Sequence, residues 1–209
     1  MPYDILDLTP RQPKQARGRA KVERILDAAT QLVKKHGADA LSSPAVAELA
    51  GIPVASVYQF FPTRYAILNE LSRRHMAALE ERITKVVADG VDHWMDGFDA
   101  SIDVVAAYLN KEPVARELFL RGPIIPEVLN VSLESDDRIA DFVMAVLPEN
   151  DQKRIEAMKP GLSPARVAIN LVIATFATGM RMEGSVTENA RAEARRVVRA
   201  YLSSYFDLD

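Results

Sequence analysis

Residues 42–68, SSPAVAELAGIPVASVYQFFPTRYAIL, contain the pattern that decides how this chain folds. A serine-proline start favours the opening of a helix, and we expect this short helix to stop at Gly51. Pro53 permits a second short helix to open, which should end before Pro62. Thr63 can then cap a longer helix. Two short helices joined by a tight turn predict a helix-turn-helix, whose second helix enters the major groove of DNA.

The second short helix and the two flanking helix starts carry side chains suited to DNA. Ala55 and Ser56 are small and allow close approach to the bases, and Gln59 can form a bidentate pair with adenine. Hydroxyl groups and cations at helix starts suit phosphates. Taken singly, each residue is equally compatible with a core or a solvated surface. The residues of this stretch whose chemistry suits DNA contact are Ser42, Ser43, Val54, Ala55, Ser56, Tyr58, Gln59, Thr63 and Arg64.

Charge is unevenly distributed along the chain, whose net charge is -3. Residues 1–75 contain 11 Lys/Arg against 7 Asp/Glu, whereas residues 76–209 contain 15 against 22. A basic N-terminal part suits a protein that presents one end to phosphates. Residues 1–18 lack apolar periodicity, which predicts a flexible basic arm before a helix from Ala20. Arg17 and Arg19 are its candidate DNA contacts, and entry into the minor groove stays open.

Composition argues against several other classes of protein. The chain contains no cysteine, which excludes disulfides and thiolate sites and fits a reducing cytoplasm. No apolar run reaches the length of a membrane span, and the N-terminus has no signal-peptide pattern. Three scattered histidines form no catalytic motif, and His93 with Asp96 gives at most two local metal ligands. We therefore predict a soluble cytoplasmic protein without catalytic residues, metal or cofactor.

Apolar residues recur at helical spacing throughout, which predicts an all-α fold. We expect an arm at 1–18, a helix-turn-helix DNA-binding domain at 19–66 and a second helical domain at 67–209. One long helix from Arg64 to about Asp89 should link the two domains. Further helices are expected near 92–109, 112–121, 126–147, 150–158, 164–182 and 188–205.

The helix-turn-helix stretch resembles the N-terminal domain of the tetracycline-repressor (TetR) family of one-component bacterial regulators, over about residues 20–70. The resemblance is carried by Val46, Ala47, Ala50, Gly51, Ser56, Tyr58, Phe61, Arg64 and Leu68. It implies a homodimer in which each subunit has a three-helix head and a larger ligand-binding body. It also implies DNA contacts from Ser42, Val54, Ala55, Ser56, Tyr58, Gln59, Phe60 and Arg64.

Three residues depart from the pattern of that family. Arg64 replaces the usual lysine, Tyr65 replaces a usual acid, and Pro53 replaces a usual serine. The proline removes a hydroxyl that would bind phosphate, which puts the expected contact at that helix start in doubt. The arginine keeps the charge but reaches differently.

In the second domain, the helices at 164–182 and 188–205 resemble the pair through which the family dimerises, although they could instead close the monomer core. The resemblance also implies a ligand cavity, with candidate lining residues Trp94, Phe98, Tyr108, Phe119, Phe142, Met144, Phe176 and Met180. Such an apolar lining favours a hydrophobic or aromatic effector. Candidate polar groups are Asn110, Arg116, Asn170, Thr175 and Arg181.

The hypothesis is a homodimeric regulator, most simply a repressor, that binds palindromic operator DNA and is released by a small effector. The ligand would tilt the helix that starts at Arg64 and change the spacing of the two recognition helices. A DNA-binding regulator without small-molecule sensing is the alternative, and an all-α enzyme is a more distant one.

Overall fold

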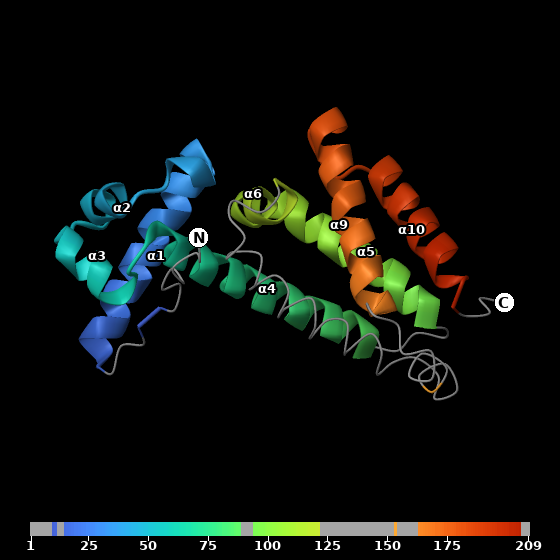
Figure 1. The fold of residues 1–209 in the computed structure, drawn as a ribbon, viewed down its shortest axis with the longest axis horizontal. Coiled ribbons are helices and arrows are strands. Elements are labelled where there is room, and N and C mark those ends of the chain that lie inside the picture. Colours follow the sequence, from blue (N-terminus) through green and yellow to red (C-terminus); the bar gives the residue numbers. More distant parts are fainter. Residues whose placement is uncertain (1–9, 12–14, 89–93, 122–152, 154–162, 206–209) are drawn as a thin grey trace, which may run out of the picture. The chain divides into compact units, whose positions relative to one another are not determined.

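The chain is all-α in a computed structural model that describes residues 10–11, 15–88, 94–121, 153 and 163–205 (Figure 1). No strand occurs among these residues. The helices are α1 (Ala16–His36), the 3-10 helix η1 (Ala38–Ala40), α2 (Ser43–Ala50), α3 (Val54–Phe60), α4 (Arg64–Ala88), α5 (Trp94–Lys111), α6 (Pro113–Leu120), α9 (Pro164–Glu183) and α10 (Glu188–Leu202). The helices expected near 126–147 and 150–158 lie outside the described residues, apart from residue 153.

The described residues divide into two compact units, and the division falls within α4. Unit 1 contains the chain up to His75 together with α6. Unit 2 contains the chain from Met76 to Glu112 together with α9 and α10. The placement of α6 in unit 1 is unexpected, because α6 follows α5 in sequence and was assigned to the second domain. Its Val114 and Leu118 are buried in the core of unit 1.

Helix α1 begins at Ala16, earlier than the start expected at Ala20. The expected start at Ala20 was based on the apolar periodicity of the sequence, which first appears at Val22. The preceding residues are mostly alanine, arginine and lysine, which favour helix without contributing to an apolar stripe. Arg17 and Arg19 consequently lie in the first turns of α1.

Unit 1 packs the helix-turn-helix around one apolar cluster. Ile25 from α1, Val46 from α2 and Val57 from α3 are fully buried in it, and Phe61 closes it at the end of α3. Such a cluster removes apolar surface from water, the main term that stabilises a small domain. The core therefore fixes α2 and α3 against α1.

Unit 2 is built on the hairpin of α9 and α10, which packs against α5. Ala190, Ala194, Val198 and Leu202 form one buried stripe of α10. Gly179 of α9 lies so close to α10 that a Cβ added there would meet the Ala190 Cβ at 2.7 Å. None of the helices that the structure describes is long and apolar enough to span a membrane.

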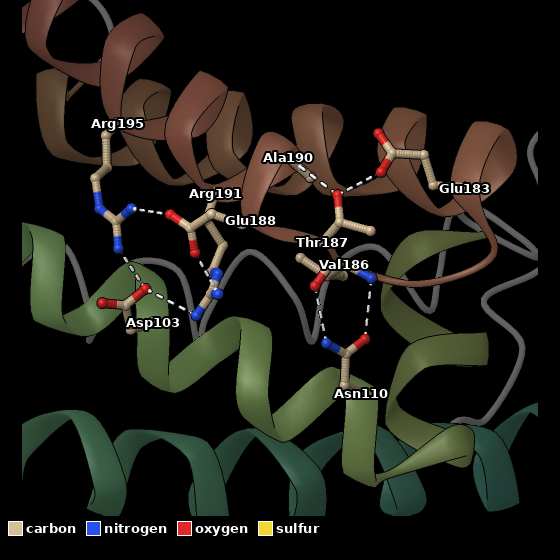
Figure 2. Close-up of polar contacts among 9 residues, drawn as sticks. All are labelled: Asp103, Asn110, Glu183, Val186, Thr187, Glu188, Ala190, Arg191 and Arg195. Atoms are coloured by element: carbon tan, nitrogen blue, oxygen red, sulfur yellow. Dashed lines mark hydrogen bonds and ion pairs between the residues drawn. The ribbon is translucent and has the colours of Figure 1, made fainter.

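Polar contacts join the α9–α10 hairpin to α5 (Figure 2). The Asn110 side chain donates to the Val186 carbonyl and accepts from the Val186 N–H, both at 2.9 Å. Asp103 of α5 pairs with Arg191 and Arg195 of α10. Asn110 thus reproduces the hydrogen bonding of a paired backbone and fixes the turn between α9 and α10.

Candidate nucleic-acid interface

The turn between α2 and α3 is defined by a side-chain cap and a left-handed residue. The Ser42 hydroxyl accepts from the Ala45 N–H at 3.3 Å and caps α2. Gly51 ends α2 with φ 62°, a conformation in which glycine avoids the cost of a Cβ. Arg24 of α1 donates to the carbonyls of Ala50 and Gly51. The helix-turn-helix predicted from residues 42–68 is confirmed.

Helix α3 presents four of the expected DNA contacts together. Val54, Ala55, Tyr58 and Gln59 are all exposed, with 40% of Val54 and 47% of Tyr58 accessible. Ala55, Tyr58 and Gln59 follow Val54 by one, four and five residues, which places all four side chains on one side of the helix. These side chains lie at the surface of unit 1, where they are accessible to a partner.

Other expected contacts face inward or serve as caps. Phe60 and Ser43 are buried, so their side chains belong to the core of unit 1. Ser56 is half-buried. The Thr63 hydroxyl accepts from the Ala66 N–H at 3.1 Å and caps α4. The side chain of Pro53 makes no capping hydrogen bond at the start of α3.

Arg64 uses its guanidinium within unit 1. It donates to the carbonyls of Asp39 at 2.9 Å and Leu41 at 3.3 Å. It also donates to the Tyr65 hydroxyl at 3.0 Å and lies over the Tyr65 ring, 4.7 Å from its centroid. The two departures from the family pattern, Arg64 and Tyr65, therefore contact one another. They tie the start of α4 to the segment that leads into α2.

An ion-pair network joins α1 to α4. The buried carboxylate of Glu70 accepts from Arg73 and Arg74, and Arg74 also pairs with Glu23 at 2.6 Å. Burial acts to raise the pKa of Glu70, but the hydrogen bonds from the two arginines outweigh it and hold that pKa below its ordinary value. The hydrogen bond from Arg74 likewise lowers the pKa of Glu23. Sequence reasoning missed this network, although the i, i+3 and i, i+4 spacing of Glu70, Arg73 and Arg74 signals part of it.

Helix α6 contacts the same segment as Arg64. The Glu117 carboxylate accepts from the Ala38 N–H at 3.1 Å and pairs with Arg121 at 2.6 Å. Gly37 has φ 81°, and a Cβ there would lie 3.0 Å from Glu117 Oε1. The segment from Gly37 to Leu41 is thus held by Glu117 and by Arg64, and it leads directly into the cap of α2.

The candidate ligand-lining residues fall into both units. Phe98, Tyr108 and Phe176 are buried in unit 2, where Met180 is half-buried, whereas Phe119 packs against the core of unit 1. The Arg82 guanidinium lies over the Tyr108 ring at 4.9 Å. Burial, with the nearby Glu112 carboxylate, raises the pKa of Tyr108. Phe142, Met144 and the side chain of Trp94 lie outside what the structure describes.

Several candidate polar groups are occupied by the protein itself. Asn110 binds Val186, as described above. Asn170 and Thr175 donate to carbonyls of their own helix at 3.0 and 2.7 Å. In the described part of the chain, no group of three or more His, Cys, Asp or Glu side chains is arranged to hold a metal ion.

Comparison with known proteins places this geometry in a family. Residues 25–71 match the model of the family described as bacterial regulatory proteins, tetR family. A TetR-family transcriptional regulator from Streptomyces coelicolor is similar in structure, with 26% identity, a TM-score of 0.66 and coverage of 89% of this chain and 99% of that one. A search of curated proteins gives no match.

Two further similar structures carry ligands. FadR of Thermus thermophilus, a TetR-family transcriptional repressor in complex with lauroyl-CoA, is 18% identical, with a TM-score of 0.64 and coverage of 90% of this chain and 96% of that one. SmeT of Stenotrophomonas maltophilia in complex with triclosan is 17% identical, with a TM-score of 0.59 and coverage of 90% and 93%. These likenesses extend over nearly the whole chain and concern the fold.

Proposed function

Because the chain belongs to the TetR family of bacterial regulatory proteins, we propose that it is a ligand-responsive repressor that binds palindromic operator DNA as a homodimer. The observation that carries the proposal is the exposed surface of α3, formed by Val54, Ala55, Tyr58 and Gln59. The core of unit 1 and the Arg24 contacts hold this surface rigid. A rigid short helix with exposed small, amide and phenolic side chains suits a major groove.

Selection of bound duplexes from a random DNA pool tests the proposal and supplies the operator. We expect a two-fold palindrome whose half-sites lie about 34–36 Å apart, since two recognition helices of a dimer read successive turns of DNA. Gln59→Ala should change the selected bases and cost about 1–3 kcal/mol at the position that it reads. Tyr58→Ala should weaken binding and leave the selected sequence the same, because a hydroxyl on a phosphate positions without reading bases.

Gln31→Ala is the matched control, since Gln31 is an exposed glutamine of α1 outside α3. Its operator and affinity should equal those of the wild type. A wild-type selection that returns no sequence would contradict the proposal. A selected half-site without two-fold symmetry would contradict the homodimer.

The proposed dimer interface is the α9–α10 hairpin. The buried stripe of α9, which includes Val172 and Phe176, packs within unit 2. Ile173, Ala177 and Met180 lie on other sides of α9 and remain partly exposed. A second copy of the hairpin could bury these side chains and form a four-helix bundle.

The proposed effector is a hydrophobic or aromatic small molecule. Support comes from the buried aromatic residues Phe98, Tyr108 and Phe176 of unit 2, and from the triclosan and lauroyl-CoA ligands of SmeT and FadR. For release, the effector must have a higher affinity for the conformation that cannot bind the operator than for the conformation that can. A difference of about 1–3 kcal/mol would change operator affinity roughly 5- to 150-fold.

Two parts of the chain connect unit 2, where we propose that the effector binds, to the unit that contains α2 and α3. Helix α4 passes from unit 1 into unit 2, and α6 follows α5 directly and binds Ala38 through Glu117. We expect Glu117→Ala to uncouple α6 from the segment that caps α2. The release of operator by triclosan or lauroyl-CoA, measured as the ratio of affinities without and with the compound, should fall towards one.

Glu117→Gln is the matched control, because its amide oxygen can still accept from the Ala38 N–H. In Glu117→Gln, the ratio of operator affinities without and with the compound should stay close to that of the wild type. Full release in Glu117→Ala would contradict the route through α6 while leaving ligand sensing intact. A wild-type ratio of one across a broad panel of apolar and aromatic compounds would contradict sensing itself.

A further inference from the structure

Arg11, which precedes α1 in sequence, is attached to the end of the recognition helix α3. The Arg11 N–H donates to the Phe60 carbonyl at 2.9 Å. Phe60 is the last residue of α3, and carbonyls in the last turn of a helix have no partner within it. This hydrogen bond satisfies one of them and places Arg11 at the C-terminal end of α3, with its side chain exposed.

Arg24 of α1 makes a second set of contacts, just before the N-terminal end of α3. Its guanidinium donates to the carbonyls of Ala50 and Gly51, just before α3 begins. Residues 17, 21 and 24 recur at the spacing that places side chains on one face of a helix. Arg17 and Lys21 therefore continue, over about 10 Å, the face of α1 that Arg24 turns towards the helix-turn-helix. Both are exposed.

These cations have no counterpart in the part of the chain that the structure describes. The side chains of Arg11, Arg17 and Lys21 make no hydrogen bond or ion pair there, and the first turn of α1 contains no acidic residue. Cations near the N-terminus of a helix are disfavoured by its dipole. Arg17, in the first turn, thus opposes helix stability, and an external polyanion would be attracted to all three cations.

We propose that Arg11, Arg17 and Lys21 bind the phosphate backbone of operator DNA next to the bases that α3 reads. This inference rests on the proposed function and extends its DNA surface from α3 to Arg11 and the first turns of α1. The guanidinium groups can bind phosphate oxygens in a bidentate manner, and the Lys21 ammonium adds a point charge. Such contacts strengthen binding and set its register without reading sequence.

Arg19 provides the matched control. It lies two residues after Arg17 and four before Glu23, so it shares the side of α1 on which Glu23 pairs with Arg74 of α4. Arg19 is equally exposed and equally charged, but it lies on the α4 side of α1 and not on the side of the helix-turn-helix. The structure therefore separates it from Arg17, with which it was grouped on sequence grounds.

The test is the salt dependence of affinity for the selected operator, measured for the full-length chain between 50 and 200 mM salt. Each phosphate contact contributes about 0.9 to the slope of log affinity against log salt concentration. Because a homodimer carries each substitution twice, Arg11→Ala, Arg17→Ala and Lys21→Ala should each lower the slope by about 1.8, so that the variant loses roughly tenfold less affinity than the wild type over this range. Arg19→Ala should keep the wild-type slope, and all four variants should select the wild-type operator.

Far-UV circular dichroism and thermal unfolding establish that each variant folds, which the exposure of the four side chains leads us to expect. Wild-type slopes in Arg17→Ala and Lys21→Ala would overturn the inference, as would an equal loss of slope in Arg19→Ala, which would indicate only a general effect of net charge. Both results would leave operator binding by the wild type in place. Absence of any selected operator would instead overturn the proposed function.

Discussion

Asn110→Leu is expected to lower the free energy of unfolding of unit 2 by about 2–5 kcal/mol. The substitution leaves both the N–H and the carbonyl of Val186 without their hydrogen-bond partner, and each unsatisfied buried polar group costs about 1–3 kcal/mol. Val186 is buried, with 3% of its surface exposed, whereas Asn110 lies at an exposed position, so water can replace only part of the lost hydrogen bonding. Denaturant unfolding followed by fluorescence of Trp94, the single tryptophan, measures the change.

Two further variants make this expectation specific. Asn110→Asp keeps an acceptor for the Val186 N–H but turns a carboxylate towards the Val186 carbonyl. Its loss of unfolding free energy at pH 7 should therefore lie between those of the wild type and Asn110→Leu. The difference from the wild type should shrink as the pH falls below about 4, where a protonated carboxyl can donate to the carbonyl. Asn170→Leu, at an exposed position of α9, should change stability by less than about 0.5 kcal/mol. Wild-type stability in Asn110→Leu would contradict the proposed role of Asn110.

Gly179→Ala is expected to destabilise unit 2 by up to about 2 kcal/mol, because the added methyl group overpacks the contact between α9 and α10 by about 1–3 kcal/mol and helix propensity returns about 1 kcal/mol. A Cβ at residue 179 would lie 2.7 Å from the Ala190 Cβ, and neither atom can rotate away. The two helices must separate or slide, and Gly179→Leu should cost more. Thermal and denaturant unfolding report the loss.

A double-mutant cycle distinguishes overpacking from other effects at Gly179. Ala190→Gly alone should cost about 1 kcal/mol through helix propensity. Combined with Gly179→Ala it removes the clash, so the double variant should be more stable than the sum of the single changes predicts, by about 0.5–3 kcal/mol. If the two losses of stability are additive, contact with Ala190 is not the cause of the destabilisation in Gly179→Ala.

Much of the N-terminal fold could be predicted because its signals are local. The end of α2 at Gly51, the opening of α3 after Pro53 and the cap of α4 at Thr63 each depend on residues within one turn of one another. The exposed set on α3 was predictable in part: Val54, Ala55, Tyr58 and Gln59 are exposed as expected, whereas Phe60, which was expected to contact DNA with them, is buried. Resemblance to a family then supplied the expected partner.

Other expectations stay predictions, because the side chain has a competing partner within the protein. Arg64 has the charge for a phosphate, and one nitrogen of its guanidinium donates to the carbonyls of Asp39 and Leu41. Asn110 has the chemistry to orient a ligand, but it pairs with the backbone of Val186. An amide or guanidinium can serve either role, and sequence spacing does not choose between partners that lie 23 or 76 residues away.

The sequence by itself determined the end of α2 at Gly51, the opening of α3 after Pro53 and the cap of α4 at Thr63, because these features arise from steric and hydrogen-bonding preferences within a few residues. Only the tertiary structure decided that α6 belongs with the helix-turn-helix, through Glu117 and Ala38. It also decided which side of α1 faces the helix-turn-helix, through Arg24, and which side faces α4, through Glu23. Packing brings together segments far apart in the chain, and the free energy of those contacts depends on the whole core.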